Sequence, residues 1–493
     1  MKQRLQNVLP TATTLALALA SAAILLLAGC ASPGTLPEHP VALDARTAGA
    51  VDSIATVWPE QRWWAGWRDA QLDALVERTL AGQPSLQTAQ ARVRQAQAAA
   101  DAANGARAPQ VNLSVDLSDQ RFTEKGLIPP PLAGATEWNN SAQFGASWEI
   151  DLFGRQRAAL DASIGQLKAA QAEVQAARVL LAGNVAAGYF NLARLVEART
   201  LAEQALQQRS QVLDLVRQRI SAGLDTTVEL RQAEGQVAQT RAEIEALDES
   251  IARTRHALAE LSGQGPHALD GLTPSLATVQ AVALPAALPA DLIGRRADLV
   301  AQRWRVEAAG RDVDVARAQF YPNLNLVAFA GLSSLGLSNF LEAGARTYGI
   351  GPALRLPIFD GGRLRANLNA KHAEVDVAID AYNAALLRAL REVADEVTSL
   401  QSIEKQQRAQ AQALVAAESA YDLALQRYRA GLGNFLVVLT AQTNVIAQRR
   451  SASELKARHL AAEVALARSL GGGYDGGSAL PPVAALVAPT ASR

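Results

Sequence analysis

Two pairs of side chains have the i, i+4 helical spacing with which a metal ion could be held. His256 and Glu260 form the first pair, and His459 and Glu463 form the second. Imidazole and carboxylate are common zinc ligands, but these pairs do not fall at equivalent positions of a repeat described below, and such pairs far more often lie on solvated helix faces. The sequence has no Walker loop, HExxH motif, nucleophile elbow or Cys/His cluster. We therefore expect no enzyme activity, no metal and no cofactor.

The single cysteine, Cys30, offers a different chemistry. Lys2 and Arg4 are followed by an apolar run at 15–27 that is too short to remain as a membrane-spanning helix. The run ends in Leu-Ala-Gly-Cys, which looks like a bacterial lipobox, where the thiol accepts a diacylglyceryl group. An ordinary signal peptide with an incidental cysteine is the alternative. We expect residues 1–29 to be a lipoprotein signal peptide and a lipid on Cys30 to anchor the mature chain, with Ala31 favouring the outer membrane by analogy with bacterial sorting.

The composition narrows the class of protein. The formal net charge is zero, which gives no case for a nucleic-acid partner. Hydrophobic residues make up 49% of the chain and aromatic residues only 5%, so the apolar content is largely alanine, leucine and valine. Such a composition favours the thin cores of close-packed helices.

A repeated stretch reveals how the chain is organised. Arg427 to Gln442 echoes Arg219 to Glu234, with an offset of 208 residues (427 − 219). Each copy has the pattern Arg-x-x-x-Gly-Leu, whose glycine suits the end of a helix because it tolerates positive φ. Helix-starting residues follow in both copies. The chain is therefore predicted to be two copies of one long unit.

Hydrophobic periodicity places the elements within each copy. After an extended arm at 30–62, the first repeat covers 63–262 with strands at about 110–118 and 141–151, a long helix at 155–221, a turn at 222–226 and a helix at 226–261. A connection follows at 263–290. The second repeat covers 291–473 with strands at about 323–331 and 347–358, a long helix at 363–429, a turn at 430–434 and a helix at 434–470; a disordered tail is expected at 474–493. Each long helix of 67 residues would measure about 100 Å.

The four predicted strands alternate apolar and polar residues and are long enough to cross a bilayer when tilted. Four strands cannot close a barrel and an open sheet edge cannot face lipid, so several chains must pool eight, twelve or sixteen strands. A soluble sandwich is the alternative. If the apolar faces meet lipid, Glu149, Asp151 and Arg355 face a polar lumen. Aromatic residues where strands meet helices suit an interfacial girdle: Trp148, Phe153, Phe320, Tyr321 and Phe359.

Five stretches carry a family resemblance: Trp63 to Leu72, Leu288 to Asp298, Leu356 to Gly362, Arg427 to Gln442, and Leu470 to Tyr474. Together with the lipobox they span nearly the whole mature chain and resemble the TolC-type outer-membrane efflux proteins, in the NodT-like lipoprotein branch that serves RND pumps. Ala297 stands where that family usually has proline. The resemblance implies a membrane α+β fold, in which a homotrimer builds a twelve-stranded outer-membrane β-barrel continued by a twelve-helix periplasmic α-barrel.

The resemblance also implies a gate at the periplasmic tip, where the family uses acidic, tyrosine and arginine side chains. By position, Glu229 falls on an acidic tie residue and Tyr428 on its tyrosine partner, while Arg219 and Asp225 lie in the same turn. Gly433, Val437 and Thr440 stand where relatives carry charge, so the gate relies on the first copy or on Leu432 and Phe435. Glu229 has a second interpretation, because Thr226-x-x-Glu229 is a capping box.

The two Arg-x-x-x-Gly-Leu turns are expected to contact a periplasmic adaptor. The residues concerned are Arg219, Gly223, Leu224, Arg427, Gly431 and Leu432. Plain hairpin turns are the alternative for both.

The sequence therefore predicts a passive, lipid-anchored exit duct in the outer membrane of a Gram-negative bacterium, as part of a tripartite RND efflux pump for drugs or other small toxic compounds. Its expected partners are two further copies of the chain, the bilayer, a periplasmic adaptor and an inner-membrane RND pump. Ducts for protein (type I) secretion or metal-ion efflux are alternatives, although a thioether copper relay is excluded because Met1 is the only methionine. A pore-less periplasmic coiled-coil adaptor fits less well, since an adaptor should carry one hairpin and this chain carries two.

Overall fold

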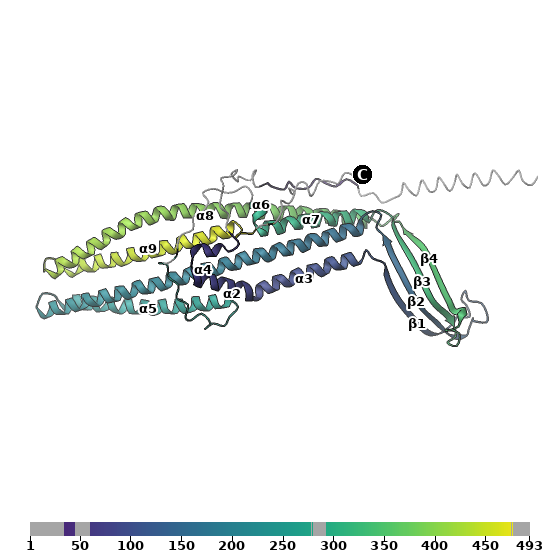
Figure 1. The fold of residues 1–493 in the computed structure, drawn as a ribbon, viewed down its shortest axis with the longest axis horizontal. Helices are drawn as coiled ribbons and strands as arrows, with labels where there is room; N and C mark the ends of the chain where they lie inside the picture. Colours follow the sequence, from purple (N-terminus) through teal and green to yellow (C-terminus); the bar gives the residue numbers. More distant parts are fainter. Residues whose placement is uncertain (1–33, 45–59, 278, 280–291, 475, 477–493) are drawn as a thin grey trace, which may run out of the picture.

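The computed structural model describes residues 34–44, 60–277, 279, 292–474 and 476, and shows an elongated molecule (Figure 1). A four-stranded sheet lies at one end, the two Arg-x-x-x-Gly-Leu turns lie at the other, and long helices join them. Cys30, the proposed signal peptide and most of the proposed tail lie outside the described residues, as do 45–59 of the arm and 280–290 of the connection.

Two helices of 67 residues form the length of the molecule. They are α4 (Arg155–Ser221) and α8 (Arg363–Arg429), and they have the ranges expected from the sequence. Each turns back into a shorter helix, α5 (Thr227–Leu261) or α9 (Phe435–Ser469), which packs against it as an antiparallel pair. At 1.5 Å per residue, α4 and α8 are each about 100 Å long.

The starts of α4 and α8 use the same device in both copies. Asp151 accepts hydrogen bonds from the backbone N–H groups of Gln156 (3.1 Å) and Arg157 (2.8 Å). Asp360 accepts from Gly362 (3.0 Å) and Leu364 (2.7 Å), and these bonds, chiefly the one from Leu364, hold its pKa below the ordinary value. The carboxylates satisfy N–H groups that have no partner within the first turn of a helix.

Shorter helices complete the half of the body nearest the sheet. In the first copy they are the 3-10 helix η1 (Trp63–Trp67), α2 (Ala70–Gly82) and α3 (Pro84–Gly105). In the second they are α6 (Leu292–Arg295) and α7 (Ala297–Ala318), with η2 (Ala343–Ala345) in the loop between two strands. α3 packs against α4, and α7 packs against both α4 and α8. Alanine and glycine permit this closeness, since a Cβ on Gly165 of α4 would lie 3.0 Å from that of Ala308.

The sheet joins the hairpins of the two copies. Its strands are β1 (Gln110–Arg121), β2 (Thr136–Ile150), β3 (Asn323–Leu335) and β4 (Arg346–Arg355), in sequence order and antiparallel throughout. β2 and β3 pair although they lie on opposite sides of the α4–α5 turn in the sequence. β1 to β3 are longer than expected, whereas β4 ends at Arg355 rather than at residue 358. The outer edges of β1 and β4 have no strand partner among the described residues.

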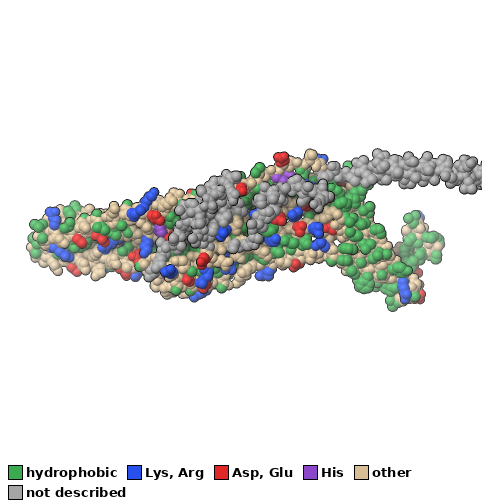
Figure 2. Space-filling model, turned by 45° about the horizontal axis from the view of Figure 1, so that its top comes forward, with side chains coloured by type: hydrophobic (Ala, Val, Ile, Leu, Met, Phe, Trp, Pro, Cys, Tyr) green, Lys and Arg blue, Asp and Glu red, His purple; other side chains and the backbone are tan. Residues whose placement is uncertain are grey.

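One face of the sheet is apolar and exposed. The register sets Leu113 opposite Phe144, Phe144 opposite Ala330, and Ala330 opposite Tyr348, so these four residues form a row on one face. Phe144 is 58% exposed and Tyr348 82%. Figure 2 shows hydrophobic side chains gathered over the strand-bearing end, while charged residues are spread over the helical body. An apolar sheet face of this size is typical of a surface that meets lipid or another protein.

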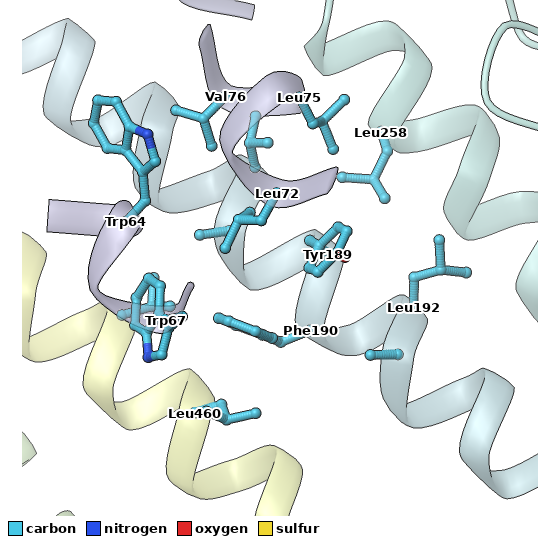
Figure 3. Packing of buried hydrophobic residues seen from close by; sticks show 14 of the residues in the cluster. Trp64, Trp67, Leu72, Leu75, Val76, Tyr189, Phe190, Leu192, Leu258 and Leu460 are labelled. Carbon is cyan, nitrogen blue, oxygen red and sulfur yellow. The ribbon is translucent and has the colours of Figure 1, made fainter. Parts of the chain in front are cut away.

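The main core lies where η1 and α2 pack against α4, α5 and α9 (Figure 3). Trp67 is 1% exposed, meets Phe190 edge to face at 5.1 Å, and donates from Nε1 to Glu463 of α9 at 2.6 Å. Asp69 caps α2 and accepts a hydrogen bond from the Tyr189 hydroxyl at 2.7 Å. The tryptophan-rich motif therefore fastens the N-terminal segment to helices of both copies.

The structure corrects one member of the expected aromatic girdle. Phe153 and Tyr321 stack at 4.8 Å and are about half exposed, and Phe359 is 90% exposed. Phe320, in contrast, is 4% exposed and belongs to the core of the second copy. It follows α7, whose final turn directs the ring inward, so adjacency in sequence to Tyr321 was misleading.

Helix α4 contains an 18-residue window that is apolar enough to cross a membrane by composition. More than half of that window (56%) is buried within the molecule. Its residues include Val185, Ala186 and Tyr189 of the main core. The apolar character of α4 is thus used in packing against other helices.

Candidate functional site

The two turns at the far end of the helices have the same backbone structure. Gly223 and Gly431 have φ of +73° and +74°, a conformation that glycine adopts without the strain of a Cβ. The Leu224 N–H bonds to the Arg219 carbonyl at 2.9 Å, and the Leu432 N–H bonds to the Arg427 carbonyl at 2.8 Å. Each helix therefore ends in a Schellman motif, in which the turn satisfies carbonyls left over at the helix end.

A polar cluster ties the first turn to the second long helix. The guanidinium of Arg219 donates from Nε to Asp225 Oδ2 at 2.9 Å and from Nη2 to Oδ1 at 3.3 Å. It also donates from Nη1 to the Tyr428 carbonyl at 3.1 Å and lies over the Tyr428 ring, 4.4 Å from the centroid. The Tyr428 hydroxyl in turn donates to Asp225 Oδ2. Arg219, Asp225 and Tyr428, hereafter the tip cluster, join the two copies at the end of the molecule.

The tip cluster is shielded from water. The side chains of Arg219 and Asp225 are 12% and 9% exposed, and Tyr428 is fully buried. Burial raises the pKa of the Tyr428 hydroxyl above its ordinary value, and the hydrogen bond to the Asp225 carboxylate raises it further. Tyr428 therefore remains a hydrogen-bond donor at neutral pH. A charge-assisted network of this kind is strongest in a low-dielectric environment.

An apolar layer packs beneath the tip cluster and includes residues from all four long helices. Phe435 lies 6.1 Å from the Tyr428 ring and is 4% exposed. Its neighbours in the layer include Val216 of α4, Val237 of α5 and Val438 of α9. Phe435 thus points into the packing of its own chain. Leu432, the other apolar gate candidate, is 71% exposed at the end of the molecule.

Glu229 does not share the tip cluster. Its Oε2 accepts from the Thr226 N–H at 2.9 Å, and Thr226 Oγ1 accepts from the Val228 N–H at 3.2 Å, so the expected capping box is formed. The hydrogen bond with the Thr226 side chain leads the effects that lower the Glu229 pKa. Within the chain, the carboxylate that pairs with Tyr428 is that of Asp225, so the expected pairing of Glu229 with Tyr428 is wrong there. Asp225 reaches Tyr428 because it stands before the helix start, on the side that faces α8.

The second turn lacks the polar side chains of the first. Gly433 stands at the position of Asp225 (225 + 208 = 433), and Asn434 caps α9 by accepting from the Val437 N–H at 3.1 Å. Arg427, the counterpart of Arg219, is exposed and makes no ion pair within the described part of the chain. Both turns present exposed apolar side chains beside their glycines, among them Leu224, Val228, Leu432, Leu436 and Val437.

The three proposed lumen residues come together where the sheet meets the helices. Glu149, Asp151 and Arg355 line an open cavity of about 600 Å³. Glu149 lies opposite Asn325, and Arg355 lies opposite Asn323, so both belong to the polar face of the sheet. Glu149 forms an ion pair with Arg155 (2.5 Å), and Asp151 lies beyond β2 as the cap of α4. Two of the three are thus engaged in holding the sheet to α4.

The histidine pairs considered as metal ligands have structural partners. His459 Nδ1 lies 3.4 Å from Glu463 Oε1, and the other oxygen of Glu463 accepts from Trp67. His256 contacts His267 edge to face at 5.8 Å. Sequence reasoning missed another histidine cluster, which joins residue 39 to residues 372 and 376. The i, i+4 spacing of His372 and Asp376 is visible in the sequence, but the approach of the arm is not.

Comparisons with known proteins agree with this architecture. The family model of outer membrane efflux proteins matches residues 75–264 and 288–472, one range for each copy of the unit. The fusaric acid resistance protein FusA of Burkholderia cepacia is 38% identical over 374 residues, which are 74% of this chain and 70% of that protein. The multidrug resistance outer membrane protein MdtQ of Escherichia coli is 33% identical over 92% of this chain and 96% of its own length.

Among solved structures, the outer membrane protein VceC of Vibrio cholerae is 35% identical, with a TM-score of 0.80 over 84% of this chain and all of that one. The Campylobacter jejuni channel CmeC, at 21% identity and a TM-score of 0.80, shows that the fold persists when the sequence has diverged. The duplicated helices, the joined hairpins and the match across both repeats lead to one conclusion: the chain belongs to the outer membrane efflux protein family, whose TolC-like members are outer-membrane channels.

Proposed function

We propose that the protein is the passive outer-membrane exit duct of a tripartite RND-type efflux pump for drugs or other small toxic compounds. The observation that carries this proposal is the sheet, which has an exposed apolar face and two unpaired edges and continues into helices about 100 Å long. The relatives named above for multidrug and fusaric acid resistance support this class of substrate. The protein itself catalyses nothing, and the inner-membrane pump supplies the energy.

The assembled duct is a homotrimer. Backbone groups at the edges of β1 and β4 cannot remain unpaired in hydrocarbon, so the edge of one copy must pair with the next. Three copies give the twelve strands that the family resemblance implies. The polar face of the sheet, with Glu149 and Arg355, then lines the lumen, and Asp151 stands at its periplasmic mouth.

The tip cluster acts as the gate. Asp225 holds Tyr428 and Arg219 together, so the pair α4–α5 cannot swing away from α8 while these bonds persist. Leu432 narrows the opening further, while Phe435 supports Tyr428 from within the chain. Glu229 contributes by fixing the start of α5, and hence the position of Asp225 next to it.

The exposed parts of both turns are the docking sites for the periplasmic adaptor. Arg219, Gly223 and Leu224 present the first turn, and Arg427, Gly431 and Leu432 present the second. The exposed leucines supply apolar area, and Arg427, which has no ion pair within the described chain, supplies a charge that an acidic partner can meet. A lipid on Cys30 anchors each copy to the outer membrane, where the strands also reside.

Planar-bilayer conductance of the purified trimer tests both the duct and its gate. The wild type should form a channel of low conductance, and Asp225→Asn should raise the conductance because Arg219 loses its ion pair. Glu229→Ala is the matched control, because it removes a carboxylate four residues away that does not touch Tyr428. Absence of any channel, also in the variants, would refute the duct. A channel that responds equally to both substitutions would refute the tip cluster as the gate.

A further inference from the structure

An N-terminal segment, residues 34–44, lies along the sheet-proximal part of α8. The Leu43 N–H donates to Asn383 Oδ1 at 2.8 Å, and Asn383 Nδ2 donates to the Val41 carbonyl at 3.0 Å. Leu36, Ala42 and Leu43 pack against the core of the second copy. We call this segment the arm. It is held by one bidentate side chain and a few apolar contacts, with no secondary structure of its own.

Between these contacts, a histidine of the arm meets a histidine of α8. The imidazole rings of His39 and His372 are stacked, with centroids 3.8 Å apart and planes inclined by 11°. His39 Nδ1 lies 2.7 Å from Asp376 Oδ1, and His372 Nδ1 lies 3.9 Å from Asp376 Oδ2. One donor atom of each residue lies within 4.8 Å of the other two. Two of the five histidines in the chain therefore converge on a single carboxylate across 333 positions (372 − 39).

The surroundings favour neutral imidazole, the form that binds metal ions. His372 is 5% exposed, and burial lowers its pKa, as does the His39 ring, with a smaller contribution from Arg317 of α7. Asp376 and a hydrogen bond with the Pro37 carbonyl act in the opposite direction. A carbonyl bonded to one ring nitrogen is the usual means of orienting the other toward a metal. His39 and Asp376 remain 21% and 32% exposed, so an ion and a water molecule can reach them.

We propose that His39, His372 and Asp376 form a binding site for a divalent first-row transition metal ion, with zinc as the best match. Two imidazoles and one carboxylate are a known zinc ligand set, with the fourth position left to water. Ligand bonds of about 2.0–2.1 Å require donor atoms roughly 3.3 Å apart. Rotation of the His39 ring out of the stack closes the present separations, since the arm can yield where α8 cannot.

The ion would lock the arm onto α8. His39 follows Cys30 by nine residues (39 − 30), a distance that an extended chain covers in about 30 Å. A lock at this place would fix how far a lipid on Cys30 stands from the body of the duct. This consequence rests on the proposed lipidation, whereas binding of the ion does not.

The chain contains its own control. His256, His267 and Asp270 also place donor atoms within 4.8 Å of one another, but all three residues are exposed. They lie near the end of α5 and in the loop after it, and they involve neither the arm nor α8. Adventitious zinc would be held there at least as well as at the arm.

Zinc titration of the full-length protein, purified without a histidine tag and followed with a competing chromophoric chelator, tests the site. We expect one zinc ion per chain in a site that His39→Ala weakens at least tenfold and His256→Ala leaves unchanged. His39 is the better variant because its loss opens no cavity in the core, unlike loss of the buried His372. A wild type without saturable binding, equal affinity in wild type and His39→Ala, or binding lost only in His256→Ala would overturn the proposal.

Hydrogen exchange of peptides that cover residues 34–44 tests the lock separately. Zinc should slow exchange of the arm amides in the wild type and in His256→Ala, but not in His39→Ala. This readout does not depend on conductance, so it distinguishes failure of the metal site from failure of the proposed duct. Zinc that binds without slowing this exchange would refute the lock.

Discussion

The two turns at the tip have one backbone and two different surfaces. Gly223 and Gly431 adopt the same left-handed conformation, and both turns close with the same pair of hydrogen bonds. Asp225 in the first turn nevertheless has Gly433 as its counterpart, and Arg219 is paired and shielded where Arg427 is exposed. Duplication therefore preserved the means of reversing the chain, while the polar contacts were placed in one copy only.

The difference is directional, because the first turn holds the second copy and the reverse contact is missing. Arg219 and Asp225 both contact Tyr428 of α8. Tyr428 corresponds to Ile220 in the first copy (428 − 208), which offers no hydroxyl to the second turn. The two helix pairs thus have unequal roles at the tip, one carrying the polar tie and the other the residue that is held.

The largest expected effect comes from comparing Arg219→Ala with Arg427→Ala. Loss of Arg219 leaves the shielded Asp225 without its cation, which should cost about 2–3 kcal/mol of the closed state. Arg427→Ala should change this free energy by less than about 0.5 kcal/mol, as expected for an exposed side chain. Bilayer conductance and hydrogen exchange of peptides around residue 225 measure both. Equal responses would mean that the turns are equivalent after all.

Tyr428→Phe should have a smaller effect, since the ring and its packing remain. Loss of the hydroxyl bond to Asp225 should cost about 1.5 kcal/mol. The raised pKa of Tyr428 also predicts a pH dependence. Because the folded pKa lies above the unfolded value of 10.0, the stabilisation is complete below pH 10 and is lost as the pH rises above it.

Tip exchange rates measured between pH 8 and pH 11 in the wild type and in Tyr428→Phe test this dependence. Other groups that titrate in this range act in both proteins, so the difference between the two curves reports on Tyr428. The difference should be constant up to about pH 10 and shrink at higher pH. A difference that begins to shrink near pH 8 would show that Tyr428 is not held as a protonated donor.

The long helices and the turns could be predicted from the sequence because their signals are local. The absence of proline and the start and stop residues gave α4 and α8 the ranges that the structure has. The pairing of β2 with β3 was not predicted, since alternation within a strand carries no information about which strand lies beside it. Likewise β4 was expected to reach Ile358, because the apolar run continues beyond the last paired residue, Arg355.

The candidate site was only partly predictable, and the misses share one cause. Asp225 and Glu229 are four residues apart, and only the three-dimensional packing decides which one meets Tyr428. The contact of His39 with His372 depends on where the arm lies along α8, which no periodicity encodes. Position within a motif therefore identified the right turn, while the partners across the tip had to come from the structure.

Gly223→Ala and Gly431→Ala test the part of the comparison in which the turns agree. A Cβ at either position meets no atom within 4 Å, so the cost is that of positive φ alone. We expect about 1 kcal/mol for each substitution, measured as faster hydrogen exchange in the last turn of α4 or α8. Gly235 of α5, which does not have positive φ, serves as a control at which alanine should be neutral or stabilising. Markedly unequal costs at Gly223 and Gly431 would show that the two turns differ in backbone as well as in side chains.

The smallest effect, and the sharpest test, should come from Gly433→Asp, which gives the second turn the carboxylate of the first. A Cβ on Gly433 would lie 3.5 Å from the Cβ of Arg427, an ordinary contact, so the substitution fits without strain. The new carboxylate should pair with Arg427, but in an exposed position worth only about 0.5 kcal/mol. Hydrogen exchange around residue 433 should slow slightly, and the effect should vanish in 1 M salt and in the double variant with Arg427→Ala. The tie at Arg219 should be unaffected, since it lies in the other turn. If Gly433→Asp instead closed the channel as firmly as the tip cluster does, charge alone would explain the gate, and the shielding of Asp225 beside Tyr428 would be incidental.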